Sequence, residues 1–413
     1  MVTIIPFKAL RPAAQHAKLV ASPPYDVLSS QEAKIAAQGN PISFLHITKS
    51  EIDLSENLSP YSEEVYAKAK ENLKAFISRE TLFIENKPCY YIYQLTMPAL
   101  ENKGKSHTQT GLVCCSSLKN YDKGLIKKHE HTRPDKELDR INHIKATGAQ
   151  TGNVFLAYTA VTEIDTIINE WVAEKNPVYD FVSGDNIKHS IWIINNSDTI
   201  NEITELFKHK VPCTYIADGH HRAASAAKAR EFFHSKSAGF FLTTLFPSNQ
   251  LQIMPYNRIV KDLNGHSIEA FIEKLESKFI IEKKDRAVQP AQPNTFGMYL
   301  SGQWYLLSAK EIPGNNDPIA SLDISILQKE ILETLLGIAD QRTDKRIDFV
   351  GGIRGLKELE QKVNNGYAVA FSLYPVSIDQ LFDVADMGVV MPPKSTWFEP
   401  KLRDGLLTHL IDS

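Results

Sequence analysis

The chain of 413 residues has few cysteines and no long apolar run. Its four cysteines are Cys89, Cys114, Cys115 and Cys213. Because no two of them have Cys-x-x-Cys spacing, they argue against a disulfide framework or a structural zinc site and favour a reducing compartment. No apolar run approaches the length of a membrane span, and the first residues lack the pattern of a signal peptide. We therefore expect a soluble cytoplasmic protein without a membrane partner.

The charge balance and the glycine pattern disfavour further classes. The formal net charge is only −3 and no long basic block occurs. This argues against a large nucleic-acid footprint, although a local basic cleft stays open. The sequence also lacks the glycine signatures of a P-loop enzyme, a dinucleotide-binding fold and an α/β-hydrolase.

Helix-like and strand-like segments alternate in the first part of the chain. Residues 62–76 and 198–207 carry apolar residues at helical spacing. The apolar runs at 89–95 and 110–116 predict a hairpin with a polar connection around residues 101–106. Residues 121–153 are dense in charge and histidine, and we expect a functional loop with short helices there.

After residue 255 the pattern restarts, with a composition shift near residue 250. The expected elements are a helix over 267–278, a hairpin of strands 296–300 and 304–307, and a long amphipathic helix over 323–336. The whole chain is therefore predicted to be α+β or mixed α/β, with a boundary within 245–260. We assign residues 1–250 to a first region and residues 251–413 to a C-terminal α+β region packed against it.

The most informative stretch is residues 215–222, where a short apolar strand runs into Asp-Gly-His-His-Arg and an alanine-rich helix. A helix start presents unpaired N–H groups and the positive end of the dipole, which favour an anion. Gly219 allows close approach of a ligand, and Arg222 can hold phosphate oxygens through two N–H groups. The alternative is an ordinary turn capped by Asp218 with exposed histidines. The crowding of side chains favours a phosphate-handling site.

Two further clusters carry acids and bases. Residues 22–27 place Asp26 after two stiff prolines, which suits a catalytic or metal-binding acid as well as a simple turn. Residues 127–134 alternate bases, Glu130 and histidines. This cluster could place a general base beside phosphate-binding cations, bind a metal, or form a solvated loop. The charges at 136–140 are expected on an exposed helix face.

A last cluster lies at residues 391–401. Lys394, Ser395 and Thr396 offer a cation and two hydroxyls in a row. They are candidates for a phosphate cradle without the glycines of a Walker loop. The charged residues 340–346 are expected at the surface.

Taken in order, the segments 24–27, 128–132, 218–222 and 391–396 make the chain resemble the DUF1015 family over essentially its whole length. The Asp-Gly-His-His-Arg element is also similar to the phosphate-binding signature of the ParB/sulfiredoxin superfamily. That superfamily includes partition-protein CTPases, sulfiredoxins and free serine kinases. The resemblance implies a ParB/sulfiredoxin-like α+β core, with residues 218–222 at its nucleotide or phosphate site.

Among these activities, the free serine kinases fit best. A sulfiredoxin needs a nucleophilic cysteine where this chain has histidine, and a partition protein needs a basic DNA-binding region that the sequence lacks. The resemblance thus implies a small-molecule phosphotransferase that forms O-phosphoserine from free L-serine. The reaction could also run in reverse, from O-phosphoserine. Pyrophosphate or ATP/ADP is the expected co-substrate and Mg²⁺ the expected cofactor. A ParB-like nucleotide-binding or nucleic-acid-associated protein and a nuclease stay as alternatives, and the oligomeric state stays open.

The resemblance also implies roles for single residues. Glu130 is the expected general base, and Asp26 is the alternative base or a metal-orienting acid. His131 belongs to the catalytic set and could also bind a far phosphate. Asp218 is expected to cap the helix or to hold Mg²⁺ through water. The remaining expected contacts to the donor phosphates or to the substrate carboxylate are Gly219, His220, His221, Arg222, Lys128, Arg133, Lys394, Ser395 and Thr396.

Overall fold

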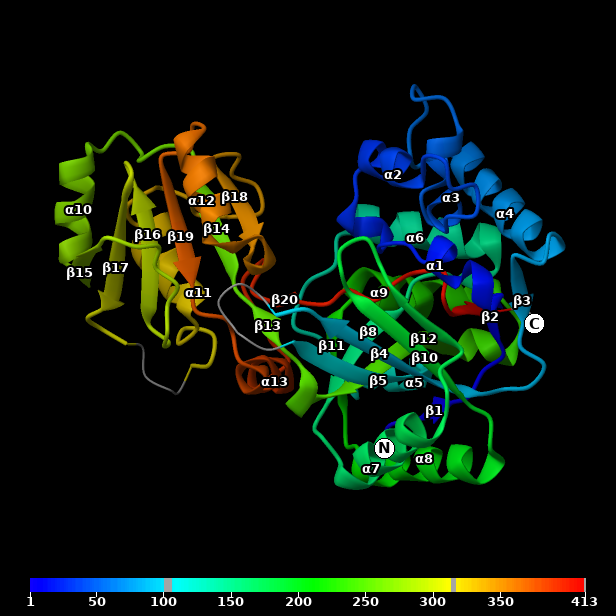
Figure 1. Cartoon of the computed structure of the whole chain (residues 1–413). Helices are drawn as coiled ribbons and strands as arrows, with labels where there is room; N and C mark the ends of the chain where they lie inside the picture. The colour runs from blue at the N-terminus through cyan, green and yellow to red at the C-terminus, as the bar shows by residue number, and fades with distance from the viewer. Residues whose placement is uncertain (100–105, 313–316, 412–413) are drawn as a thin grey trace. The chain divides into compact units, whose positions relative to one another are not determined.

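The computed structural model describes residues 1–99, 106–312 and 317–411, which form two compact units (Figure 1). The first unit comprises Met1–Leu251 and Pro400–Ser413, and the second comprises Gln252–Glu399. The end of the chain, assigned above to the C-terminal region, thus belongs to the first unit. The reason is that β21 (Thr408–Leu410) pairs with β2 (Ala9–Pro12) and β7 (Ala149–Gln150). A pairing between strands so far apart in the sequence could not be predicted from local patterns.

The first unit is built on a mixed sheet to which nine strands of the described residues belong. The strand order is β6-β11-β8-β12-β5-β4-β10-β9, with β1 also paired to β5. Only the pairs β6–β11 and β8–β12 are parallel. The bounds are β1 Ile4–Ile5, β4 Tyr90–Met97, β5 His107–Ser117, β6 Ile126–Lys127, β8 Val154–Tyr158, β9 Tyr179–Val182, β10 Lys188–Ile194, β11 Thr214–Asp218 and β12 Phe240–Pro247. The smaller sheet of this unit adds β3 (Leu82–Ile84) beside β2.

The predicted hairpin of the first unit is confirmed. Strands β4 and β5 pair antiparallel, with Tyr91 opposite Val113. Most residues of both strands are buried, because the strands lie in the middle of the sheet and are covered on both faces. The polar connection at residues 100–105 lies outside the described residues.

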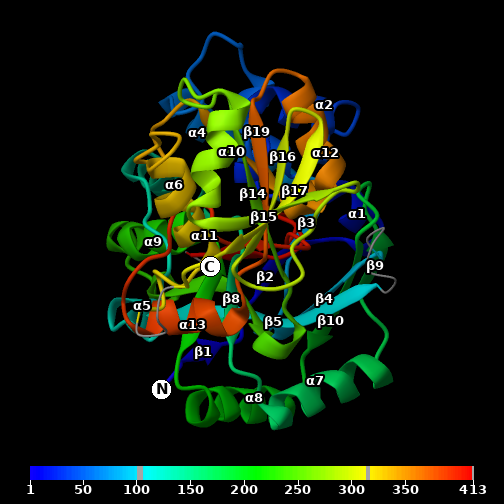
Figure 2. The same ribbon diagram turned by 90° about the vertical axis from the view of Figure 1, so that its left-hand side faces the viewer.

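Two helices, α7 (Thr162–Glu174) and α8 (Ser197–Lys210), lie side by side along the large sheet (Figures 1 and 2). Ile168 and Phe207 are buried in one apolar cluster with strand residues such as Leu112. Each such side chain contributes roughly 1.5–3 kcal/mol of burial free energy. The helix predicted over 198–207 is thus confirmed, with its inward face as expected.

A second group of helices packs around α9 (His220–Ala229), which follows β11 directly. Helix α6 (Pro134–Thr147) packs against α9, and α4 (Glu63–Ser78) packs against α6. The remaining helices of this unit are α1 Ala17–Val20, α2 Ser30–Ala37, α3 Leu45–Thr48 and α5 Leu118–Asp122. The long α6 corrects the expectation of a loop with short helices at residues 121–153.

Helix α6 also corrects the expectation of an exposed charged face at residues 136–140. Glu137 and Asp139 are buried, whereas Leu138 between them is exposed. Each acid has a partner that offsets its burial, because Glu137 accepts from Lys228 and Asp139 accepts from the Tyr66 hydroxyl. Over residues 137–139 the polarity is therefore inverted with respect to an ordinary amphipathic helix.

The second unit contains a six-stranded antiparallel sheet in the order β15-β17-β16-β19-β14-β18. Its strands are β14 Tyr256–Val260, β15 Phe279–Lys284, β16 Thr295–Leu300, β17 Gln303–Ala309, β18 Ile347–Gly351 and β19 Val369–Leu373, with the separate pair β13 Ile253–Met254 and β20 Trp397–Phe398. Its helices are α10 Ile268–Glu276, α11 Asp323–Leu327, which continues as a π-helix over Gln328–Glu333, α12 Gly355–Asn364 and α13 Ile378–Asp386. Leu359 of α12 packs on the sheet beside Ile259 and Trp304.

Two elements predicted for the second unit are confirmed, and the helix predicted over 323–336 is α11 with its π-helical continuation to Glu333. The hairpin over 296–307 is confirmed as β16 and β17, and its turn residues Ser301 and Gly302 both have positive φ. The helix expected over 267–278 is α10, which begins after Ser267. The described residues confirm a mixed α and β architecture. No helix among them is both long and apolar enough to cross a membrane.

Candidate functional site

The turn from β11 into α9 is built around Gly219. This residue is the N-cap of α9 and lies at φ 96°, a conformation that favours glycine. A Cβ atom there would lie 3.3 Å from the Arg222 guanidinium carbon. Asp218 is therefore not the helix cap, and that part of its expected role is wrong. No side-chain capping bond is formed at this helix start, so the N-cap residue supplies no acceptor for the first N–H groups of α9.

Arg222 joins two acids that are far apart in the sequence. Its Nη2 donates to Oδ2 of Asp218 at 3.0 Å and to Oδ2 of Asp26 at 3.4 Å, and its Nη1 donates to the carbonyl of Asn153. Only 7% of its side chain is exposed. Burial acts to lower the pKa of Arg222, but the nearby carboxylates raise it overall, so the guanidinium stays charged. An incoming phosphate would have to share this cation with both acids.

Asp218 is held by a cation at each oxygen. Its Oδ1 lies 3.5 Å from Nζ of Lys401, while its Oδ2 accepts from Arg222. Burial acts to raise the pKa of Asp218, but Lys401, Arg222 and His220 hold it well below its ordinary value. Asp218 is thus a carboxylate throughout the physiological range.

His129 and His220 form a buried pair at the start of α9. Their rings meet edge-on with centroids 4.6 Å apart, and the backbone N–H of His129 donates to Nε2 of His220 at 3.5 Å. Burial lowers the pKa of His129 to about 4 and that of His220 well below its ordinary value. Both imidazoles are therefore neutral near pH 7, so His220 would contact a phosphate as an N–H donor rather than as a cation. Nδ1 of His220 lies 3.8 Å from Oε2 of Glu130.

This histidine pair predicts a loss of stability in mild acid. An unfolded histidine titrates near its ordinary value of 6.5, above the folded value of about 4 for His129. The stability contributed by neutral burial is therefore complete above pH 6.5 and is lost as the pH falls toward 4. Each such group contributes a slope of up to about 1.4 kcal/mol per pH unit. Urea denaturation at several pH values in this window measures it.

A matched pair of variants assigns this slope. His129→Gln should flatten the pH dependence, whereas replacing the exposed His234 by glutamine should leave it unchanged. A free energy of unfolding that stays constant across the window in the unaltered protein would contradict the prediction.

The loop at residues 128–133 is attached to α9 through His221. The backbone N–H of Arg133 donates to Nε2 of His221 at 2.9 Å. The Arg133 side chain points outward and pairs with Asp135. His221 thus positions the loop, a role that the sequence did not indicate.

A cavity of about 180 Å³ opens beside this loop. Its lining residues are Tyr121, Lys128, Glu130, His131, Thr132, Ile216 and His220. Nζ of Lys128 lies 3.9 Å from the centre of the Tyr121 ring, and burial lowers the pKa of Lys128. The volume is below that of most pockets for whole cofactors, so it suits a phosphate group or a small substrate.

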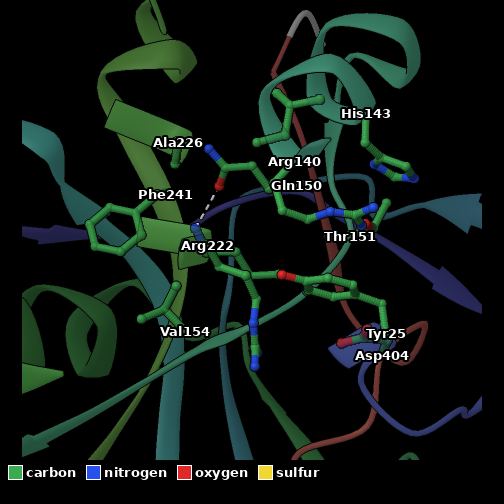
Figure 3. Close-up of a pocket in the computed structure, with 13 residues that line it drawn as sticks. Tyr25, Arg140, His143, Gln150, Thr151, Val154, Arg222, Ala226, Phe241 and Asp404 are labelled. Atoms are coloured by element: carbon green, nitrogen blue, oxygen red, sulfur yellow. Dashed lines mark hydrogen bonds between the residues drawn. The ribbon is translucent and has the colours of Figure 1, made fainter. Parts of the chain in front are cut away.

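Arg222 lines a second, smaller cavity of about 30 Å³ (Figure 3). Tyr25, Arg140 and Asp404 contribute to its lining. The Arg140 guanidinium lies 4.0 Å from the centre of the Tyr25 ring, which fixes the segment that carries Asp26. This space has room for one or two water molecules.

The structure brings together the segments around Asp26, Glu130 and Asp218 in the first unit. Lys394, Ser395 and Thr396 belong to the second unit. There Lys394 has φ 57° and its Nζ lies 5.5 Å from the Tyr256 ring centre, while Ser395 Oγ donates to the Pro392 carbonyl at 2.6 Å. Their contact with a phosphate remains a prediction.

The acids of the site do not fit a resident magnesium ion. The described residues contain no group of three His, Cys, Asp or Glu side chains placed to hold a metal. Both oxygens of Asp218 already face cations. Mg²⁺ commonly binds through substrate phosphates with few protein ligands, so magnesium stays a prediction for the donor rather than for the protein alone.

Sequence reasoning missed several residues of this site. Arg140 was expected on an exposed face, and Lys401 and Asp404 were given no role. The spacing of the charged residues in α6 is the same for a buried and for an exposed helix face, so the sequence did not indicate that Arg140 faces the site. No local sequence pattern marks Asp404, which lies at the site because the end of the chain belongs to the first unit.

The fold and site define a mixed α/β protein with a charged cluster at a helix N-terminus. A family model described as "Protein of unknown function (DUF1015)" matches residues 4–325. The chain therefore belongs to the DUF1015 family, as its motifs predicted.

Solved structures show only distant likeness to the chain. A free serine kinase variant in complex with AMP is 14% identical, with 72% of this chain and 91% of that chain covered and a TM-score of 0.36. SbnI with a C-terminal truncation, from Staphylococcus aureus, is 11% identical, with 72% and 87% covered and a TM-score of 0.39. A conserved hypothetical protein from Pyrococcus furiosus is 13% identical, with 73% and 95% covered and a TM-score of 0.32. No curated protein matches the chain. TM-scores this low add nothing to the family assignment.

Proposed function

We propose that this protein is a small-molecule phosphotransferase, and specifically a kinase for free L-serine with a ParB/sulfiredoxin-like core. The observation that supports it is the meeting of three distant segments at the start of α9. Arg222 ties Asp26 to Asp218, and His220 lies beside Glu130. A helix N-terminus with lysines and ionised acids nearby provides both a phosphate contact and a proton acceptor.

The reaction needs little covalent chemistry from the protein. The serine Oγ attacks the terminal phosphorus of the donor, and the bond from that phosphorus to the bridging oxygen breaks with its electrons going to the leaving phosphate. The serine hydroxyl proton passes to a carboxylate, either Asp26 or Glu130. Both acids have partly exposed side chains, so either can reach a bound substrate.

The choice of donor lies between pyrophosphate and ATP or ADP. The cavity beside Lys128 is large enough for phosphate groups but small for a whole nucleotide. A nucleotide donor would therefore place its base and ribose outside this cavity. Serine as the acceptor rests on the family resemblance, and Mg²⁺ would bind with the donor phosphates.

A donor panel tests this proposal. We expect O-phosphoserine to form from serine and Mg²⁺ with at least one of pyrophosphate, ATP and ADP, as followed by phosphorus NMR. Alanine in place of serine is the matched control, because it lacks the accepting hydroxyl and should give no phosphorylated product. Absence of product with every donor, in both directions, would exclude the kinase. Nucleotide-dependent self-association, salt-sensitive DNA retention or plasmid cleavage would then favour the alternatives.

A further inference from the structure

The segment at residues 400–404 lies beyond the family match at residues 4–325, yet it is built into the first unit. The backbone N–H of Ser22 donates to the Asp404 carbonyl at 3.1 Å, and the Asp404 N–H donates to the Ser22 carbonyl at 2.9 Å. This pairing places the segment against the stretch that leads into Asp26. A Cβ atom at Gly405, which has φ 88°, would lie 2.6 Å from the Phe44 ring, so only glycine fits where the chain leaves the segment.

Arg403 anchors the middle of this segment. Its backbone N–H donates to the Tyr93 hydroxyl at 3.3 Å, and its guanidinium donates to Asp185 and to Ser183 Oγ. The side chain is buried against the large sheet. The contacts of Arg403 and the pairing of Asp404 with Ser22 fix the backbone of the segment. The side chains of Lys401 and Asp404 therefore start from fixed backbone positions.

Lys401 is the more accessible of the two cations that hold Asp218. Its Nζ lies 3.5 Å from Asp218 Oδ1, and 18% of its side chain is exposed, against 7% for Arg222. Arg222 is also committed to Asp26 and to the Asn153 carbonyl. A lysine ammonium on a flexible stem can leave one oxygen of a carboxylate and follow an incoming phosphate.

Asp404 is the third acid around Arg222. It is buried, and neither of its carboxylate oxygens has a hydrogen-bond partner among the described residues. The Nε of Arg222 lacks a partner there as well, and both residues line the same small cavity (Figure 3). They approach each other across Gly152, where a Cβ atom would lie 3.1 Å from Arg222 Cδ and 3.4 Å from Asp404 Oδ1. A water in the cavity could bridge the two groups.

We propose that this segment is a working part of the phosphoryl-transfer site. Lys401 contacts the phosphate of the donor, and Asp404 is a positioning residue that keeps the Arg222 guanidinium between Asp26 and Asp218. This inference rests on the proposed function and assigns it two residues outside the family match.

Variants of Lys401 test the first half of the proposal. Lys401→Met should lower kcat/KM for the donor by about 10- to 100-fold, the loss expected when a charged contact is removed, and should weaken binding of ADP or pyrophosphate in calorimetry. Lys401→Arg should recover most of the loss. The exposed Lys18, replaced by methionine, is the control and should behave as the unaltered protein. If the parent protein is active and Lys401→Met has an unchanged kcat/KM, the role assigned to Lys401 is wrong. The role assigned to Asp404 would not be affected by this result.

Variants of Asp404 test the second half. The ionisable groups that face it are Arg222, Asp26 and Arg140, and the backbone N–H of Tyr25 also approaches it. Burial raises the pKa of Asp404 to about 7, so the unaltered protein should lose kcat as the pH falls below 7. Asp404→Asn should have the lower kcat at every pH, so its kcat should not fall further below pH 7. Its KM for the donor should be nearly unchanged. A variant that keeps both the rate and the fall in kcat below pH 7 would overturn the positioning role.

The two failures can be told apart. A parent protein that neither turns over serine nor binds ADP or pyrophosphate would overturn the proposed function and this inference with it. An active parent protein with unaffected variants would overturn only the inference.

Discussion

Replacing Asp26 with asparagine is expected to lower the rate of phosphoryl transfer to serine by about 10²- to 10⁴-fold, the contribution of a general base. The carboxylate lies 3.4 Å from Arg222 Nη2, and 39% of its side chain is exposed. It is therefore held in place by a buried cation while one side remains open to a substrate. Asparagine keeps the shape of aspartate but cannot accept the serine proton. Initial rates over a range of serine concentrations, followed by phosphorus NMR, measure the effect.

Glu130→Gln is the matched variant for this experiment. The sequence pointed first to Glu130, which lines the cavity beside Lys128 and lies 3.8 Å from His220. We expect the larger loss at Asp26, because the buried guanidinium of Arg222 fixes its carboxylate. A full rate in Asp26→Asn together with a large loss in Glu130→Gln would return the role of base to Glu130. Binding of ADP or pyrophosphate should survive both changes, since neither acid is expected to hold the donor.

Elements with a regular apolar period could be predicted from the sequence. Helix α8 and the hairpins β4–β5 and β16–β17 each carry their burial pattern within a short window, so local spacing suffices. The same reasoning failed for α6, where Glu137 is buried and Leu138 is exposed. That inversion depends on Lys228, which lies on another helix and cannot be paired with Glu137 from spacing alone.

The candidate site divides in the same way. Gly219 and the helix start were predictable because the glycine and the alanine-rich run are adjacent in the sequence. The side chains that contact this helix start could not be predicted, because they come from segments that are distant in the sequence. Asp218 was expected to cap the helix or to hold Mg²⁺ through water, but it pairs with Arg222 in the first turn of α9 and with Lys401 from a distant segment. A single sequence records no distance between residues 26, 218 and 401, so the cluster becomes visible only in the folded chain.

Replacing Arg222 with methionine is expected to lower the free energy of unfolding by about 3–5 kcal/mol, the usual result of removing one partner from a buried charge cluster. Most of this loss comes from the buried Asp404, because the side chains of Asp26 and Asp218 are 39% and 31% exposed and can be partly solvated. The variant should also be inactive as a kinase, because Asp26 and Asp218 lose their common anchor. Urea denaturation near pH 7.5 measures the stability term, and Arg342→Met, which removes an exposed arginine, should produce no measurable change.

The double variant Arg222→Met with Asp404→Asn separates a charge effect from a packing effect. If Arg222 acts by compensating the acids, the neutral asparagine should recover part of the lost free energy, and the two changes will be non-additive. If the loss arises only from packing around the guanidinium, Asp404→Asn should add its own effect without recovery. An Arg222→Met protein as stable as the parent would contradict the role of this cation altogether. Activity should not return in the double variant, because the asparagine restores charge balance without restoring the link between Asp26 and Asp218.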